Sequence, residues 1–221
     1  SARQEVALLM DYISGVHLRA ILKVAQRHTL PFSHDEIASM IWDMFRGLKA
    51  LHRAKRGKSK PCPIAHGDLS PTNIMIREDG SAILIDLSSA SSVLSTDNIL
   101  RRPGKLAYLS PGQQRGEEEG VEGDLYALAC IWIELVTGSL LKVDHKGMSW
   151  RQFYEAGWPI QWAKIVYGLL SPLPQVRAKM IVYLTREALW GGSRGEHSLR
   201  QKHARSSLRH RVKASLKSRA D

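Results

Sequence analysis

Apolar residues recur at every third or fourth position between residues 33 and 52, as on one face of an α-helix. This face carries Ile37, Ile41, Phe45, Leu48 and Leu51. Ser33 and Glu36 precede the apolar face with the spacing of a capping box, in which each side chain bonds the backbone of the other residue. The pattern therefore predicts an amphipathic helix that begins after Ser33 and ends near His52.

A second segment, residues 125–136, is apolar on all sides except for Glu134. A helix with no polar face must be buried, so this segment is expected to run through the core. Asp124 before it is a suitable N-cap, and Gly138 after it is a suitable C-terminal residue in the left-handed conformation.

Two short apolar runs, residues 74–76 and 83–85, flank Asp79-Gly80, a strong signal for a two-residue hairpin turn. If that turn sets the register, Asn73 lies opposite Asp86 at the open end of the hairpin. Asp68 is only five residues before Asn73 and is expected nearby. Oxygen ligands placed in this way suit Mg²⁺, which completes its octahedron with water and phosphate.

The composition is that of a folded domain. The chain has 221 residues, of which 43% are hydrophobic, enough for one sizeable core. Cys62 and Cys130 give neither a disulfide framework nor a zinc-site spacing, which favours a reducing compartment. No signal peptide is recognised, and residues 125–136 are too few to span a bilayer. We therefore expect a soluble, cytoplasmic protein without a membrane span.

The net charge of +11 is unevenly distributed. Residues 191–221 contain nine lysines and arginines against two acidic residues, and residues 46–60 contain seven basic residues and no acid. Basic segments can bind nucleic acid or acidic membranes. The C-terminal segment has no Phe, Tyr or Trp on which bases could stack, so nucleic acid is not an expected partner. The simpler interpretation is a solvated helix face and a disordered basic tail.

The order His66-x-Asp68-x-x-x-x-Asn73, followed by Asp86, resembles the catalytic loop and the metal-binding aspartate of protein kinases. The resemblance implies a mainly α fold with a small β-hairpin sheet (α+β), similar to the C-terminal lobe of a kinase. It implies ATP and Mg²⁺ as cofactors and a protein as substrate. Asp68 and Asn73 would be catalytic residues, with Asp68 as the base, and Asn73 and Asp86 would hold the metal and the nucleotide.

The resemblance also divides the chain. Residues 1–14 would be a residual small-lobe strand and hinge, in which residues 5–13 are extended and Met10 and Tyr12 meet the adenine. Residues 15–190 would be the large lobe, and residues 191–221 the basic tail. The Gly-rich loop, strand lysine and helix glutamate of a complete kinase are not found before the hinge. The sequence as given is therefore expected to be a large lobe with most of its small lobe missing.

The sequence departs from the kinase pattern at three further positions. Ser70 stands where a lysine commonly contacts the transferred phosphate, and Ser88 replaces the glycine two residues after the metal-binding aspartate. Gly112 replaces a glutamate that pairs with a buried arginine, for which Arg177 is the candidate, so Arg177 is expected to be exposed or to weaken the lobe. The resemblance gives Asp124 an architectural role, in which its carboxylate holds the catalytic loop.

Three functions remain open. The first is a Ser/Thr protein kinase-like phosphotransferase that moves the ATP γ-phosphate to a protein hydroxyl. The second is an inactive pseudokinase, or a truncated kinase, that acts as a binding module. The third is a small-molecule kinase of the aminoglycoside or choline type, which the His66-Gly67-Asp68-Leu69 sequence would also suit. The sequence does not indicate an oligomeric state.

Overall fold

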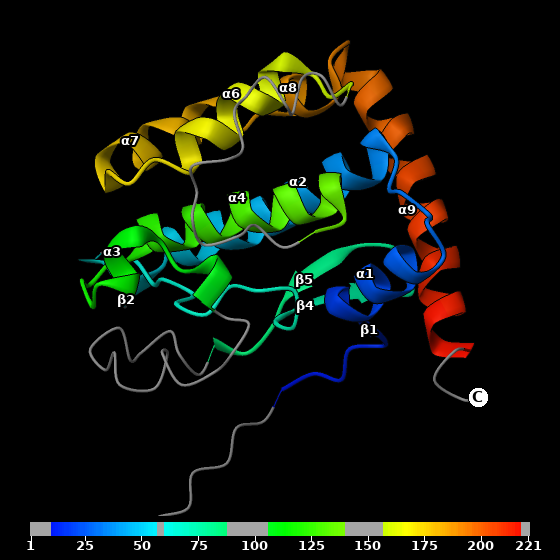
Figure 1. Ribbon diagram of the computed structural model, residues 1–221, viewed down its shortest axis with the longest axis horizontal. Coiled ribbons are helices and arrows are strands. Elements are labelled where there is room, and N and C mark those ends of the chain that lie inside the picture. Colours follow the sequence, from blue (N-terminus) through cyan, green and yellow to red (C-terminus); the bar gives the residue numbers. More distant parts are fainter. Residues whose placement is uncertain (1–9, 57–59, 88–105, 140–156, 218–221) are drawn as a thin grey trace, which may run out of the picture.

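Two helices packed side by side form the centre of the molecule, as the computed structural model shows for residues 10–56, 60–87, 106–139 and 157–217 (Figure 1). These are α2 (His34–His52) and α4 (Val121–Thr137). A three-stranded sheet and α1 (Leu18–Arg27) lie on one side of them, and α6 (Ile160–Leu169), α7 (Pro174–Lys179) and α8 (Arg186–Trp190) lie on the other. This arrangement is the predicted mainly α fold with a small sheet.

The smaller elements complete the description. They are β1 (Gly15–His17), β2 (Lys55–Arg56), β3 (Lys60–Pro61), β4 (Ile74–Arg77), β5 (Ala82–Leu84), η3 (Leu106–Tyr108), α3 (Pro111–Gln114), η4 (Met180–Tyr183) and the long helix α9 (Arg194–Lys217). None of the helices in the described ranges has the length and apolar character needed to cross a lipid bilayer.

Helix α2 has the predicted ends. The Ser33 hydroxyl accepts from the Glu36 amide at 3.2 Å, and the Glu36 carboxylate accepts from the Ser33 amide at 2.7 Å, so the capping box is formed. The helix ends at His52. Four members of the predicted apolar face are buried, and Leu51 near the helix end is half-buried.

Helix α4 is buried along almost its whole length, as its apolar composition predicts. It begins at Val121, one turn earlier than expected, so Asp124 lies inside the first turn and Gly120 is the N-cap. At the other end Gly138 adopts the left-handed conformation with φ 69°, and its amide bonds the Glu134 carbonyl.

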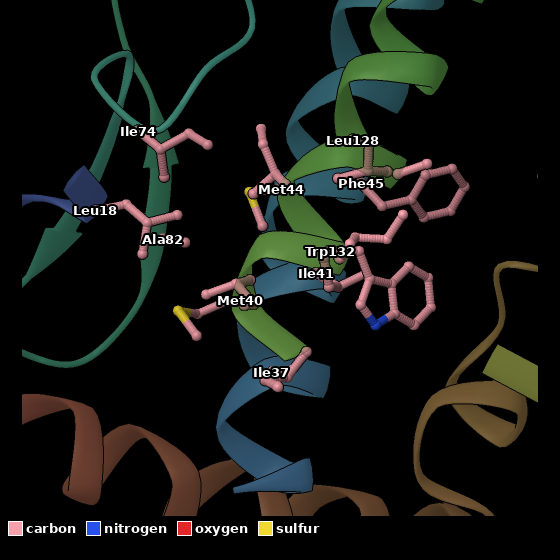
Figure 2. Packing of buried hydrophobic residues seen from close by; sticks show 14 of the residues in the cluster. Leu18, Ile37, Met40, Ile41, Met44, Phe45, Ile74, Ala82, Leu128 and Trp132 are labelled. Carbon is pink, nitrogen blue, oxygen red and sulfur yellow. The ribbon is translucent and has the colours of Figure 1, made fainter. Parts of the chain in front are cut away.

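Figure 2 shows how α2 joins the sheet to α4. Met40 and Met44 of α2 extend toward Ile74 and Ala82 of the hairpin, on the side of the helix away from Trp132. All five of these side chains are less than a tenth exposed. Full burial of an apolar side chain as large as Ile or Met contributes roughly 1.5–3 kcal/mol to the stability of the fold. The hairpin is therefore fixed to the helical core through α2.

The hairpin β4–β5 has a different register from the predicted one. Ile74 pairs with Leu84 and Ile76 with Ala82, and the Ile85 amide bonds the Asn73 carbonyl. The turn contains three residues, 78–80, and Gly80 adopts φ 81°, as in hairpins that end with a left-handed residue. The extra residue places Asn73 opposite Ile85, so the expected pairing of Asn73 with Asp86 was wrong by one position.

The basic segment that follows α2 contains the short antiparallel pair β2–β3. The N-terminal segment differs from expectation. Residues 10–13, predicted to be extended strand, form no strand, and the rest of that prediction lies outside the described residues. The third strand of the main sheet is instead β1, which pairs with β4 through Val16 and Ile76. Three residues are too short a run to give an alternation signal.

The expectation of a disordered C-terminal tail was wrong. Residues 194–217 form α9, which packs against the N-terminal half of α2 and next to the hairpin (Figure 1). Its buried face carries Ala204, Leu208 and Val212, spaced four residues apart. The high content of basic residues hid this narrow apolar face. The backbone of Arg205 comes so close to the hairpin turn that a Cβ on Gly80 would lie 2.2 Å from the Arg205 carbonyl oxygen.

Part of the positive charge of α9 is neutralised by acidic residues of α2. Arg200, Arg205 and Arg211 pair with Asp35, Asp43 and Glu36, respectively. Burial by itself would raise the pKa of Glu36, but the hydrogen bonds from Arg211, Ser33 and Ser207 outweigh it and leave that pKa lowered. These ion pairs orient a helix whose sequence alone resembles that of a solvated tail.

The ion pair between Arg177 and Glu119 corrects another expectation. Arg177 is fully buried, and its guanidinium pairs with the Glu119 carboxylate and donates to the Ser171 carbonyl at 2.7 Å. The Ser110 hydroxyl donates to the same carboxylate at 2.6 Å. A Cβ on Gly112 would lie 2.2 Å from Oε1 of Glu119. The carboxylate expected at position 112 is therefore supplied by residue 119, and the lack of a side chain at Gly112 makes room for it.

Replacement of Leu208 tests whether α9 belongs to the folded domain. We expect Leu208→Ala to lower the free energy of unfolding by about 2–5 kcal/mol, because a fully buried leucine leaves a cavity. Leu199→Ala is the matched control on the same helix, since Leu199 is 58% exposed, and should change it by less than about 0.5 kcal/mol. Urea denaturation followed by circular dichroism measures both. Equal effects of the two variants would contradict the packing of α9.

A second prediction concerns the buried ion pair. Glu119→Ala should destabilise the protein by about 3–5 kcal/mol, because it leaves the Arg177 guanidinium buried without its counter-charge. The exposed neighbour provides the control Glu118→Ala, for which we expect almost no change. Adding Gly112→Glu to Glu119→Ala should recover a substantial part of the loss in denaturant titrations. A double variant no more stable than Glu119→Ala alone would exclude the replacement of one carboxylate by the other.

Candidate active site

The loop that contains Asp68 is held by a single buried carboxylate from α4. Asp124 accepts from the His66 amide at 2.8 Å and from the Gly67 amide at 3.0 Å. The Nε2 atom of His52, at the end of α2, lies 2.9 Å from the same carboxylate. The loop is therefore tied to both central helices immediately before Asp68, and the architectural role expected for Asp124 agrees with this geometry.

Asp68 and Asn73 are in direct contact. The Nδ2 atom of Asn73 donates to the Asp68 carbonyl at 2.7 Å and to the Asp68 carboxylate at 2.9 Å. Asn73 is buried, whereas Asp68 is half-buried and so remains within reach of solvent. The contact fixes the direction of the Asp68 carboxylate, which can accept a proton. It also leaves Oδ1 as the atom of the Asn73 side chain suited to a cation.

Asp86 lies next to this pair through the backbone of the hairpin. Asn73 and Ile85 are joined by a backbone hydrogen bond of 3.0 Å, and Asp86 follows directly. The Ile85 carbonyl is in turn 3.1 Å from Nε2 of His66, so the loop and the hairpin end are connected. Asp86 is exposed and adopts φ 63°, a left-handed conformation that is uncommon outside glycine. Such backbone outliers occur preferentially at functional sites.

The chemistry of these side chains fits Mg²⁺ better than a metal held entirely by protein. Within the described ranges, no group of three or more His, Cys, Asp and Glu side chains is arranged to hold a metal ion. Mg²⁺ commonly takes only one or two carboxylates and completes its shell with water and phosphate oxygens. An exposed carboxylate at Asp86 and an amide oxygen at Asn73 match that preference. These two residues could therefore hold Mg²⁺ together with a nucleotide.

The position of Ser70 carries no cation. Ser70 is 3% exposed, and its hydroxyl lies 2.8 Å from that of Thr72. Its polar group is thus satisfied within the loop. Leu87 is exposed, and Ser88, where a glycine was expected, lies outside the described residues.

A second polar cluster, which the sequence analysis did not predict, borders the loop. Arg19 of α1 donates to the Glu134 carboxylate at 2.6 Å, and the Tyr108 hydroxyl donates to the same carboxylate at 2.5 Å. Burial and the nearby Glu134 carboxylate raise the pKa of Tyr108, so its hydroxyl stays protonated. The Arg19 amide also bonds the Pro71 carbonyl of the loop. The charged residue in the otherwise apolar α4 segment, Glu134, was the available signal for this cluster.

The residues predicted to meet the adenine are far more exposed than the loop. Met10 and Tyr12 are 61% and 92% exposed, and neither lies in a helix or strand. Their assignment therefore rests on the sequence resemblance.

Comparison with known proteins gives a consistent result. Residues 1–165 match the family described as the protein kinase domain. The chain is similar to serine/threonine-protein kinase PknB of Mycolicibacterium smegmatis, with 31% identity over 136 residues, 59% of this chain and 20% of that protein. It is also similar to serine/threonine-protein kinase A of Synechocystis, with 25% identity over 138 residues, 60% of this chain and 26% of that protein. The chain thus spans about a quarter or less of the length of these relatives.

Asp124 offers a test of how the loop is held. We expect Asp124→Asn to lower the free energy of unfolding by about 1–3 kcal/mol, because the substitution weakens the acceptor of the buried His66 amide and the partly buried Gly67 amide. The His66 and Gly67 amides should exchange faster with solvent, as NMR can measure. Glu122→Gln makes the same chemical change in the first turn of α4 and should leave these amides unchanged. Unchanged exchange in Asp124→Asn would contradict the proposed support of the loop.

Proposed function

The chain belongs to the protein kinase superfamily, and from this premise we propose that it takes part in phosphate transfer from ATP to a protein hydroxyl group. Asp68 acts as the base that orients the hydroxyl and accepts its proton. Asn73 and Asp86 hold Mg²⁺ and, through it, the nucleotide phosphates. The observation that carries the proposal is the fixed pair of Asp68 and Asn73 in a loop anchored by Asp124.

The proposed reaction is a direct displacement at phosphorus. The acceptor oxygen forms a bond to the γ-phosphorus while the bond to the oxygen between the β- and γ-phosphorus atoms breaks, and ADP leaves. The Asp68 carboxylate takes the hydroxyl proton, and the bond from Asn73 Nδ2 holds that carboxylate in one orientation. Mg²⁺, when bound, neutralises the charge that collects on the phosphate oxygens. Catalysis of this kind depends on positioning, which the bonds around the loop supply.

A second candidate function is that of a binding module without catalysis. It is favoured by Ser70, which is buried and bonded to Thr72 where a lysine would add positive charge near the transferred phosphate. Nucleotide binding without measurable phosphate transfer to protein acceptors would favour this function. The small-molecule kinase is less well supported, because the relatives are named as serine/threonine-protein kinases.

Binding of ATP in the presence of Mg²⁺ tests the site before any substrate is known. We expect isothermal titration calorimetry to show Mg²⁺-dependent binding that Asp86→Asn weakens by at least about tenfold, or ~1.4 kcal/mol, because a charged metal ligand becomes neutral. The matched control is Asp79→Asn, the same change in the exposed turn of the same hairpin, which should bind as the original chain does.

Two results would count against the proposal. If the original chain is folded by circular dichroism and binds no ATP with Mg²⁺, the enzyme function fails for this polypeptide. If Asp86→Asn binds as tightly as Asp79→Asn, the nucleotide is held elsewhere, and the roles given to Asn73 and Asp86 are wrong.

A further inference from the structure

A hollow of about 350 Å³ opens beside the candidate catalytic loop, between α1, the start of the hairpin and the end of α9. Its lining includes His17, Arg19, Lys23, Arg27, Thr72 and Ser215. None of the described residues that line it is acidic, and the remaining two are small or apolar. Its volume is within the range of sites that hold a small ligand or a few side chains.

The three basic residues are placed with helical regularity. Arg19, Lys23 and Arg27 are spaced four residues apart, so they share one face of α1. Like charges at this spacing destabilise a helix, and α1 contains no acidic residue to offset them. Arg27 lies in the last turn of α1, where the helix dipole favours a cation, so the repulsion concerns mainly its spacing from Lys23. A face that carries like charges is complementary to a ligand of opposite charge.

The three basic side chains of this face differ in whether an acidic group of the protein already pairs with them. Arg19 is bound to Glu134 and Tyr108, so much of its charge is neutralised within the protein. Lys23 and Arg27 are exposed, and neither has an ion pair among the described residues. The hollow is thus lined by the guanidinium of Arg19, which is held by Glu134 and Tyr108, and by two accessible cations, Lys23 and Arg27.

The hollow is also connected to the candidate active site. The Arg19 amide donates to the Pro71 carbonyl at 3.0 Å, which attaches the start of α1 to the loop. Thr72, which lines the hollow, directly precedes Asn73, the residue bonded to Asp68. A chain bound in the hollow would therefore lie beside the loop that is proposed to receive the acceptor hydroxyl.

We propose that this hollow, the α1 hollow, binds a polypeptide segment with two or more acidic side chains, either carboxylates or phosphates. The choice of a polypeptide over a single-stranded nucleic acid rests on the described lining residues, none of which is a Phe, Tyr or Trp on which bases could stack. If this polypeptide segment belongs to the protein that accepts the phosphate, that role rests on the proposed function. The binding itself does not, because it needs neither ATP nor phosphate transfer.

Fluorescence anisotropy with short labelled peptides tests the proposal on the whole chain without nucleotide. The probes are a flexible peptide with four glutamates, the same peptide with four glutamines, and one with phosphoserines at those positions. The glutamate and phosphoserine peptides should bind at least about tenfold more tightly than the glutamine peptide at moderate salt. Added salt should weaken this binding, because the contacts are between charges near the surface.

Two double variants separate the hollow from the general positive charge of the protein. Lys23→Glu with Arg27→Glu should weaken binding of the glutamate peptide by at least about tenfold. Lys202→Glu with Lys213→Glu lowers the net charge by the same amount on the exposed face of α9, and should leave binding within about twofold. Circular dichroism establishes that both variants are folded.

Several outcomes would overturn the proposal. Equal losses in the two double variants would show that the peptides respond to net charge and not to the hollow. Equal binding of the glutamate and glutamine peptides would remove the acidic requirement. Inorganic phosphate or a single-stranded oligonucleotide that binds through Lys23 and Arg27, while the peptides do not, would assign the hollow to another ligand. Failure of ATP binding, by contrast, would leave this result unaffected and would bear only on the proposed function.

Discussion

The carboxylate of Asp124 is the constraint on which the candidate site depends. It accepts two consecutive amides of a loop that has no regular secondary structure, and it does so from the first turn of a buried helix. Buried amides without partners are costly, so this one group both satisfies the loop and fixes its path. Asp68 follows directly, and its own bond from Asn73 sets its direction. The geometry at Asp68 therefore derives from α4, which anchors the loop, together with Asn73, which holds the carboxylate.

Helix α4 supports the candidate site through two buried carboxylates. An apolar helix with no solvent face can carry a charge only where another element satisfies it, and α4 carries Asp124 and Glu134 as such buried charges. Asp124 holds the loop, while Glu134 holds Arg19 and Tyr108. These two buried carboxylates thus link α4 to the loop and to the Arg19 and Tyr108 cluster beside it. A helix with an almost entirely apolar sequence therefore carries the carboxylates that hold the candidate site.

The parts that could be predicted from sequence are those governed by local chemistry. The capping box at Ser33 and the left-handed Gly138 depend on a few neighbouring residues and form as expected. The hairpin register depends on whether the turn has two or three residues, which the same Asp79-Gly80 sequence permits in both cases. The pairing of Glu119 with Arg177 joins residues 58 positions apart, so no local pattern contains it. Helix α9 is held by a narrow buried face and by acidic partners on α2 that are distant in sequence, and composition alone does not reveal either.

The two main departures from the kinase pattern have different physical causes. A buried guanidinium at Arg177 requires a carboxylate for the lobe to be stable, so the loss at Gly112 is matched by Glu119. Ser70 makes no such demand, because its hydroxyl is neutral and is already bonded to Thr72. The need for a stable fold therefore accounts for a carboxylate beside Arg177, but it does not require a lysine in place of Ser70. The presence of a replacement carboxylate is evidence of an intact lobe, whereas catalysis has to be judged from Asp68, Asn73 and Asp86.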